Sequence, residues 1–249
     1  MSMSAENLLE ENVSNENEWQ SMYVLGGVAT VIALVGVVLD VIIGSTTGGN
    51  LSALPQTAID RFAQFQIAPL LGLYNLDLLN IFNQIMLIPA YVALYAVQRK
   101  ANSAYALLAL IIFLVGTTIF VTTNTALPML ELSNKYASAT TDSQRTLLAA
   151  AGEAMLARGT HGGLGVFIGF LLPNIAGLIM SFAMLTGKVF NKITSYLGIA
   201  GSALILLYIV LVTFAPSIKD MATAFAMPGG LLLMAWMIMF TIRLFQVAR

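Results

Sequence analysis

The most restrictive feature of this sequence is one apolar stretch, residues 74–95, that is long enough to cross a lipid bilayer yet contains strongly polar side chains. These side chains are Asp77, Asn80, Asn83 and Gln84. At about 100° per residue on a helix, one stripe of the segment carries Asp77, Asn80, Gln84, Tyr91 and Tyr95. The opposite side carries Leu78, Ile81, Phe82, Ile85 and Pro89. Because polar groups are costly in lipid, the segment predicts a membrane helix with one side toward protein and the other toward lipid.

Composition supports the same interpretation for the whole chain. Of 249 residues, 58% are hydrophobic and 9% are charged, whereas an ordinary soluble domain has about 25% charged residues. Apolar runs of about 18 residues or more are typical of helices that span a membrane. Six such runs occur, at residues 23–44, 76–97, 104–127, 162–185, 196–214 and 222–245. The sequence therefore predicts an all-α protein, a polytopic bundle of six transmembrane helices whose first partner is the lipid bilayer.

The composition also argues against several classes of function. The net charge is -1 and the basic residues are thinly spread, so no basic face is expected to bind nucleic acid. The chain has no Cys and one His, which leaves too few ligands for a thiolate or zinc site. We therefore expect no metal and no cofactor.

The first 20 residues differ from the rest of the chain, because they contain five Glu and no Lys or Arg. The apolar run that follows them has no small-residue cleavage site, so they do not fit a secretory signal peptide. We expect residues 1–20 to form an acidic, mobile tail. Residues 21–249 are expected to form a single six-helix transmembrane domain.

The distribution of basic residues predicts the orientation in the membrane. The short loops after the second and fourth spans are basic and contain Arg99, Lys100, Lys188 and Lys192. The longer connections balance their charges, as in the neighbouring pair Asp60 and Arg61. Because basic loops stay on the cytoplasmic side, we expect a multi-pass protein of the cell membrane with both termini in the cytoplasm.

Small residues recur at intervals of three and four in two of the spans. In the first span they are Gly26, Ala29, Ala33 and Gly36. In the fourth span the corresponding row is Gly162, Gly165, Gly169, Pro173 and Ala176. Such rows allow helix backbones to approach closely. The glycines of the fourth span lack the lysine and the preceding strand of a phosphate-binding loop, so close packing is the better interpretation.

Two amphipathic surface helices are expected in the outer loops. Residues 55–67 have a partial apolar face, and Pro69 should end this helix because the residue before proline avoids the helical region. Residues 141–158 begin with the capping candidate Thr141. Their predicted apolar face consists of Leu147, Leu148, Ala151 and Met155.

Six polar residues are the candidates for a functional site. Within about two turns of the outer ends of their helices lie Asp40, Asp77, Asn80, Asn124 and His161. Gln84 lies deeper, on the same stripe as Asp77. Ionisable groups inside a membrane usually face a cavity, so we expect an outward-opening polar pocket that binds or moves a small molecule or a lipid. The alternative is that these groups bond one another and only hold the helices in register.

Three classes of function fit this pattern. Ligand binding ranks first, because polar groups converge while no nucleophile motif is present. The second class is an accessory or structural subunit that contacts a membrane protein partner. The third is an intramembrane enzyme that uses His161 with Asp40 or Asp77 as acid and base, or Ser202 as a nucleophile. We assign no catalytic residue, because a lone His is more often structural.

Three segments of the chain resemble a known family. They are LDLLNIF at residues 76–82, LSNKYASATTDSQRTLLAAAGEAMLA at residues 132–157 and FNKITSYLGIAG at residues 190–201. Their pattern is similar to that of a prokaryotic family of six-helix membrane proteins described only as a domain of unknown function. The resemblance extends from about the second to the fifth span. It implies the six-helix architecture and brings no catalytic residues to this sequence.

Overall fold

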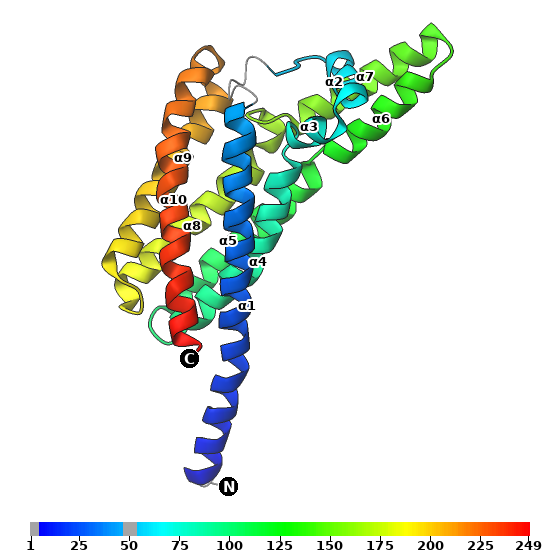
Figure 1. The fold of residues 1–249 in the computed structure, drawn as a ribbon. Coiled ribbons are helices and arrows are strands. Elements are labelled where there is room, and N and C mark those ends of the chain that lie inside the picture. Colours follow the sequence, from blue (N-terminus) through cyan, green and yellow to red (C-terminus); the bar gives the residue numbers. More distant parts are fainter. Residues whose placement is uncertain (1–4, 47–53) are drawn as a thin grey trace.

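The protein is a bundle of long helices, seen in a computed structural model that describes residues 5–46 and 54–249 (Figure 1). The long helices are α1 (Ala5–Thr46), α4 (Leu78–Gln98), α5 (Ser103–Thr123), α8 (Phe167–Gly187), α9 (Lys192–Phe214) and α10 (Lys219–Val247). The shorter ones are α2 (Ala58–Ile67), α3 (Pro69–Tyr74), α6 (Ala126–Ser138), α7 (Asp142–Gly159) and the 3-10 helices η2 (Leu164–Val166) and η3 (Pro216–Ile218). The described residues contain no strand.

Six helical segments of the described chain are long and apolar enough to cross a membrane. They are Trp19–Thr46, Leu78–Gln98, Ser103–Ser138, Leu164–Gly187, Lys192–Phe214 and Met221–Val247. These segments confirm the predicted six-span helical bundle. Residues 5–20, within the predicted acidic tail, belong to α1, and the mobility of this tail stays a prediction.

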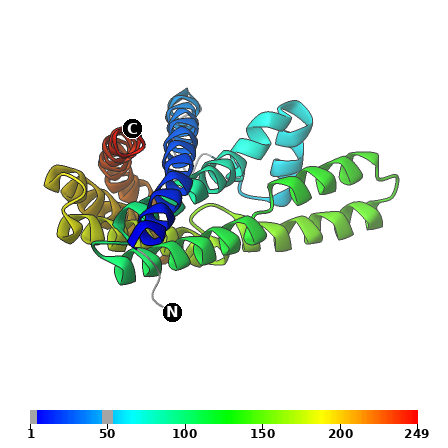
Figure 2. The same ribbon diagram turned by 90° about the horizontal axis from the view of Figure 1, so that it is seen from below.

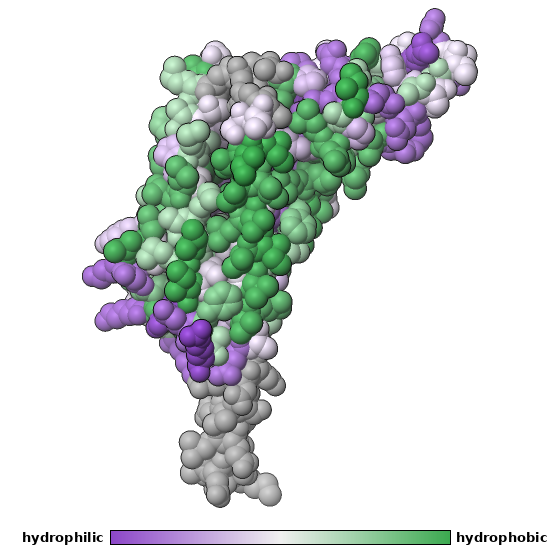
Figure 3. All heavy atoms as spheres, in the orientation of Figure 1, coloured by the Kyte–Doolittle hydropathy of each residue, from purple (hydrophilic) through white to green (hydrophobic). Residues whose placement is uncertain are grey.

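The long helices pack in a consistent order. α1 packs on α4 and α10, α5 packs on α8, and α9 packs between α8 and α10, as Figures 1 and 2 show. The interior between them is filled by small and aromatic side chains such as Ala33, Ala90 and Phe113. Apolar side chains also cover much of the outer surface of the bundle (Figure 3). This surface faces the lipid in a membrane-spanning bundle.

The two sides of α4 have the environments that its sequence predicts. Phe82 and Ile85, on the apolar side, are exposed on the surface of the bundle. Tyr91, on the polar stripe, is buried. Asp77 is also buried, but it precedes the first residue of α4 and so lies off the helical stripe. The polar stripe therefore faces protein and the apolar side faces outward.

Close packing of α1 on α4 depends on glycines in α1. A Cβ atom added to Gly26 would lie 2.5 Å from the Cβ atom of Ala93 and 2.9 Å from the carbonyl oxygen of Pro89. A Cβ atom added to Gly36 would collide with the side chain of Asn83. The small-residue row of the first span therefore lies at a helix contact, as predicted.

The shorter helices α2, α3, α6 and α7 gather at the end of the bundle away from the C-terminus, which we call the distal end (Figure 1). A small second core holds them together and includes Phe62, Phe65, Leu76, Met129 and Leu156. α6 and α7 form a hairpin that projects beyond the bundle (Figures 1 and 2). The surface of the outer part of this hairpin is largely polar (Figure 3).

The third span bends at Asn124 and continues beyond its predicted end at residue 127. The backbone of Asn124 is extended, with φ -63° and ψ 140°, which ends α5 at Thr123. The side-chain oxygen of Asn124 accepts a hydrogen bond from the backbone N–H of Ala126 over 2.9 Å. Because this contact satisfies a free donor at the start of the next helix, α6 begins directly after the bend.

The two surface helices lie where the sequence places them. α2 ends at Ile67 and Pro69 opens α3, which confirms the predicted helix end. α7 begins after Thr141, whose side-chain oxygen accepts a hydrogen bond from the backbone N–H of Gln144. The predicted apolar face of α7 is covered only in part, because Leu147 lies in the projecting half of the hairpin and is 72% exposed.

Replacing Gly26 with Ala should lower the melting temperature of the purified protein in detergent, because the added methyl group meets the backbone of α4. Overpacking of this kind costs about 1–3 kcal/mol. Gly230 in α10 is the matched control, since a Cβ atom added there meets nothing within 4 Å. Gly230→Ala should leave the melting temperature unchanged or raise it. Equal melting temperatures for the two variants would contradict the close packing of α1 on α4.

Candidate functional site

The site begins with an unusual turn between α3 and α4. Asp77 precedes the first residue of α4 with φ 64°, a left-handed conformation that Asp and Asn tolerate better than most residues. Its side chain makes no capping bond to α4 and is 8% exposed. The turn therefore leaves a buried carboxylate available to other segments.

His161 meets this carboxylate from the segment between α7 and η2. Its Nδ1 atom lies 3.0 Å from both carboxylate oxygens of Asp77. Its Nε2 atom lies 2.8 Å from the hydroxyl oxygen of Tyr208 on α9. Gly162 follows with φ 74°, which allows the chain to turn toward α8 directly after the histidine. Three segments that are distant in sequence therefore meet at one imidazole ring.

The surroundings of the His161 imidazole favour its charged form. Burial alone lowers its pKa, but the charge of Asp77, the electrostatic effect of Tyr208 and the hydrogen bonds to both residues outweigh burial. The pKa of His161 is therefore raised well above its usual value of about 6.5. In the charged form both ring nitrogens carry a proton, so Nδ1–H donates to Asp77 and Nε2–H donates to the hydroxyl oxygen of Tyr208.

Asn80 and Asn124 complete the surroundings of Asp77. The Nδ2 atom of Asn80 donates to Oδ1 of Asp77 over 2.9 Å. The Nδ2 atom of Asn124 donates to the carbonyl oxygen of Leu76 over 2.6 Å, which ties the end of α5 to the turn before α4. We call the residues that meet here the distal cluster: Asp77, Asn80, Asn124, His161 and Tyr208.

Asp40 and Gln84, the remaining predicted residues, make no hydrogen bond to the distal cluster among the described residues, although the charges of Asp77 and His161 act on Asp40. The hydroxyl of Tyr74 donates to the backbone carbonyl oxygen of Asp40 over 3.0 Å. Burial, followed by the charge and the hydrogen bond of Asp40, raises the pKa of Tyr74. Gln84 lies about two turns further into the bundle than Asp77, and its buried Oε1 atom has no hydrogen-bond partner among the described residues.

Sequence reasoning misses two residues of this region. The signal for Tyr208 is a hydroxyl-bearing aromatic residue near the distal end of an otherwise apolar span. The second residue is Arg61, whose charge sequence reasoning balances with that of its neighbour Asp60. In the structure Arg61 is buried, and Asp60 accepts a hydrogen bond from the hydroxyl of Thr57. The pairing fails because successive side chains on a helix point about 100° apart.

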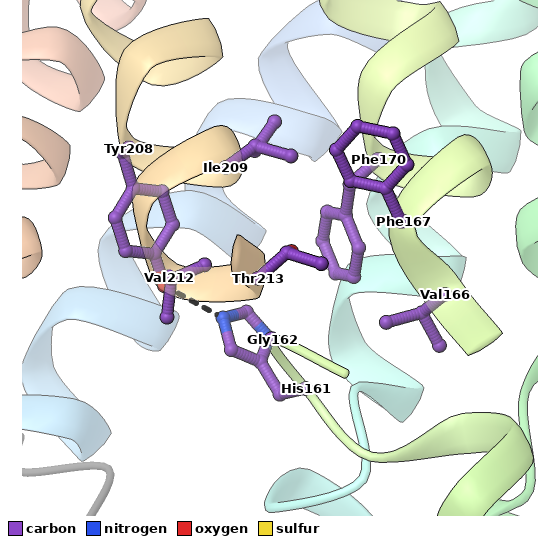
Figure 4. A pocket seen from close by; sticks show the side chains of 9 residues that line it. All are labelled: His161, Gly162, Val166, Phe167, Phe170, Tyr208, Ile209, Val212 and Thr213. Atoms are coloured by element: carbon purple, nitrogen blue, oxygen red, sulfur yellow. Dashed lines mark hydrogen bonds between the residues drawn. The ribbon is translucent and has the colours of Figure 1, made fainter. Parts of the chain in front are cut away.

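A narrow pocket lies beside His161, between the distal ends of α8 and α9 (Figure 4). Its wall consists of His161, Gly162, Val166, Phe167, Phe170, Tyr208, Ile209, Val212 and Thr213. The wall is mostly apolar, with His161 and Tyr208 as its main polar groups. The space at its centre is about the size of one water molecule. A larger ligand therefore needs α8 and α9 to move apart.

The chemistry available to the distal cluster is hydrogen bonding and proton exchange. An imidazolium donates from both of its nitrogens, and a tyrosine hydroxyl such as that of Tyr208 can donate to a further acceptor. In the described part of the chain, no group of three or more His, Asp or Glu side chains is arranged to hold a metal ion. The arrangement is therefore suited to recognising polar groups.

Thermal stability should depend on pH through His161. Because the folded-state pKa lies above the unfolded value, the pair with Asp77 contributes fully below about pH 6.5 and loses its contribution as the pH rises through the folded-state pKa. The melting temperature should therefore fall as the pH is raised above about 6.5. Asp77→Asn should flatten this dependence, because a neutral partner no longer favours the imidazolium. A parent profile as flat as that of Asp77→Asn would contradict the ion pair.

Comparison with known proteins agrees with the resemblance carried by the three sequence segments. The model of the family described as Domain of unknown function (DUF4386) matches residues 21–242. The match includes every residue of the distal cluster. No curated protein and no solved structure matches the chain.

Proposed function

The chain belongs to the family described as Domain of unknown function (DUF4386), and we propose that it binds or moves a small molecule or a lipid at the distal cluster. The observation that carries this proposal is the position of His161. One ring nitrogen is held by Asp77, while the other meets Tyr208 at the wall of the pocket between α8 and α9. A ligand in this pocket would meet a fixed cation and a hydroxyl group surrounded by apolar side chains.

The energetics of a buried ion pair support a functional role for the distal cluster. Removing two charges from water is costly, and apolar residues of similar size often hold a fold together as well or better. Helix packing alone therefore gives little reason for Asp77 and His161 to occupy this position. A ligand that uses the cation and the hydroxyl group gives such a reason.

The distal end of α8 is the part of the pocket wall best suited to move. It begins with the 3-10 helix η2, whose hydrogen bonds are weaker than those of an α-helix. Pro173 lies inside α8 and removes one of its backbone hydrogen bonds. Movement of this segment away from α9 would widen the pocket without disturbing the pair of Asp77 and His161.

A second candidate function is favoured by the hairpin of α6 and α7. The hairpin projects from the distal end with a largely polar surface (Figures 1 and 3). A projecting, well-formed helical hairpin offers a surface to a membrane protein partner, as expected for an accessory subunit. Deletion of residues 137–145 would separate the two functions, because it shortens the hairpin while keeping Tyr136, which packs on Phe62 of the small second core.

Native mass spectrometry of the gently extracted protein should show a bound small molecule or lipid. The Tyr208→Phe variant should retain about threefold to tenfold less of this ligand, which is the effect expected for the loss of one hydrogen bond. This variant removes a hydroxyl group from the pocket wall and leaves the Asp77 carboxylate paired. The matched control is Tyr196→Phe on the same helix, since Tyr196 is 57% exposed. Absence of any ligand from the parent protein, with a lower melting temperature for Tyr208→Phe, would indicate a purely structural cluster.

We also propose that both termini face the cytoplasm, which would open the distal cluster outward. The loops after α4 and α8, at the same end as the C-terminus, carry Arg99, Lys100 and Lys188. Figure 3 shows a polar surface at this end. Basic residues at one end of a bundle favour the cytoplasmic side.

Cysteine labelling tests this orientation cleanly, because the chain has no Cys. A membrane-impermeant maleimide should label Ser217→Cys, at the distal end, in intact cells. It should label Ser103→Cys, at the start of α5, only after the membrane is permeabilised. The reverse pattern would place the termini outside and the distal cluster on the cytoplasmic side.

A further inference from the structure

An arginine at the distal end is buried with two guanidinium nitrogens that have no hydrogen-bond partner among the described residues. Arg61, on α2, is 2% exposed. Its Nε and Nη1 atoms are buried and have no hydrogen-bond partner, and no ion pair to Arg61 is found among the residues that the structure describes. Buried polar groups are nearly always bonded in folded proteins, so this guanidinium needs an explanation.

The charge of Arg61 persists despite its burial. Burial lowers the pKa of Arg61 to about 10, which still leaves the side chain protonated at neutral pH. A buried charge is stable when it is paired and hydrogen-bonded. The guanidinium therefore has a strong tendency to bind an anion or a group of acceptors.

Asp77 is the carboxylate whose charge acts on Arg61, but its oxygens are already engaged. The Nδ1 atom of His161 lies 3.0 Å from both of them, and Asn80 donates to one of them over 2.9 Å. Arg61 and His161 are thus two cations beside one carboxylate. The second cation is left with unused hydrogen-bond donors.

α2 packs on α3, the helix before the turn that carries Asp77, and the charge of Asp77 acts on Arg61. Phe62, the next residue along α2, shares the small second core with Leu76, the residue before Asp77. This region lies beyond the start of α4 and therefore at the edge of the membrane-spanning part of the bundle. Phosphate groups of lipids and free anions in solution both reach this level of a bilayer.

We propose that the ligand of the distal cluster carries a carboxylate or a phosphate group and that Arg61 binds this group. The inference rests on the proposed function, because it names the chemical class of the ligand bound there. A planar guanidinium matches the oxygens of both groups with paired hydrogen bonds. Gln64, about one turn further along α2, also has a buried side-chain oxygen without a described partner. Rotation of its amide group would turn an NH2 donor to the same anion.

Binding of the anion needs a small movement of α2. Two hydrogen bonds hold this helix to the hairpin. The backbone N–H of Ala58 donates to the side chain of Glu153 over 2.7 Å. The hydroxyl of Ser133 donates to the carbonyl oxygen of Phe62 over 3.0 Å. Both bonds lie on the side of α6 and α7. The side of α2 that faces the turn before α4 can therefore open while these bonds are kept.

The test measures the melting temperature of the full chain in detergent with two anionic probes, inorganic phosphate and phosphatidylglycerol. The control for phosphate is chloride at equal ionic strength, and the control for phosphatidylglycerol is diacylglycerol with matched acyl chains. Phosphate or phosphatidylglycerol should raise the melting temperature, and chloride and diacylglycerol should not. A shift with both probes identifies a site for free anions, and a shift with phosphatidylglycerol alone identifies a lipid headgroup. Either result supports the anion site, whereas no shift with either probe overturns it.

Variants at Arg61 separate this inference from a structural role. Arg61→Gln should raise the anion concentration needed for half of the shift by about tenfold or more, as expected for loss of a charged hydrogen bond. Arg61→Met should be at least as stable as the parent without anion, because it removes an unpaired buried charge. Arg145→Gln, at an exposed position of α7, is the matched control and should keep the parent shift. A shift unchanged in Arg61→Gln overturns the inference.

The same variants distinguish failure of this inference from failure of the proposed function. If the parent retains a ligand that Tyr208→Phe loses and Arg61→Gln keeps, the proposed function stands and the anionic class is wrong. If the parent retains no ligand but the shift with phosphate disappears in Arg61→Gln, the anion site stands without the proposed function.

Discussion

The ion pair of Asp77 and His161 fixes the arrangement of the distal end. It joins the start of α4 to the segment after α7, two points 84 residues apart in the sequence. Tyr208 adds α9 to the same contact, and Asn124 ties the end of α5 to the turn before α4. The short distal helices pack in a core of their own. The ion pair is therefore one of the polar contacts that join this core to the membrane-spanning bundle, together with the bond from Tyr74 to Asp40.

The bundle itself depends on a different kind of contact. Between helices surrounded by lipid the hydrophobic effect gives little attraction, so close packing and hydrogen bonds must hold them together. Gly26 brings α1 against Ala93 of α4, and Gly116 brings α5 against Pro173 of α8. The distal end, where α2, α3, α6 and α7 gather, uses charges and polar side chains as well. The protein thus combines a tightly packed apolar body with a polar end in which single contacts carry more of the specificity.

The sequence predicts the six spans well because length and apolar composition are enough to identify a membrane helix. It predicts part of the candidate site for the same reason, since Asp77, Asn80 and His161 stand out in apolar surroundings and do come together. Tyr208 is harder to foresee, because an aromatic hydroxyl near a span end is common at membrane interfaces. The burial of Arg61 depends on how α2 packs on distant parts of the chain. Helical periodicity alone does not contain that information.

The contrast between Asp77 and Arg61 is the most informative property of the distal end. Within one small region a carboxylate has both oxygens contacted by His161 and one of them also by Asn80, while a buried guanidinium has donors with no partner among the described residues. A polar group that serves only stability is expected to be bonded within the protein, because an unmade bond costs more than a made bond contributes. A binding site has the opposite requirement, since its groups must be held firmly by one set of neighbours and remain open to the ligand. Asp77 and Asn80 meet the first requirement, and Arg61 meets the second.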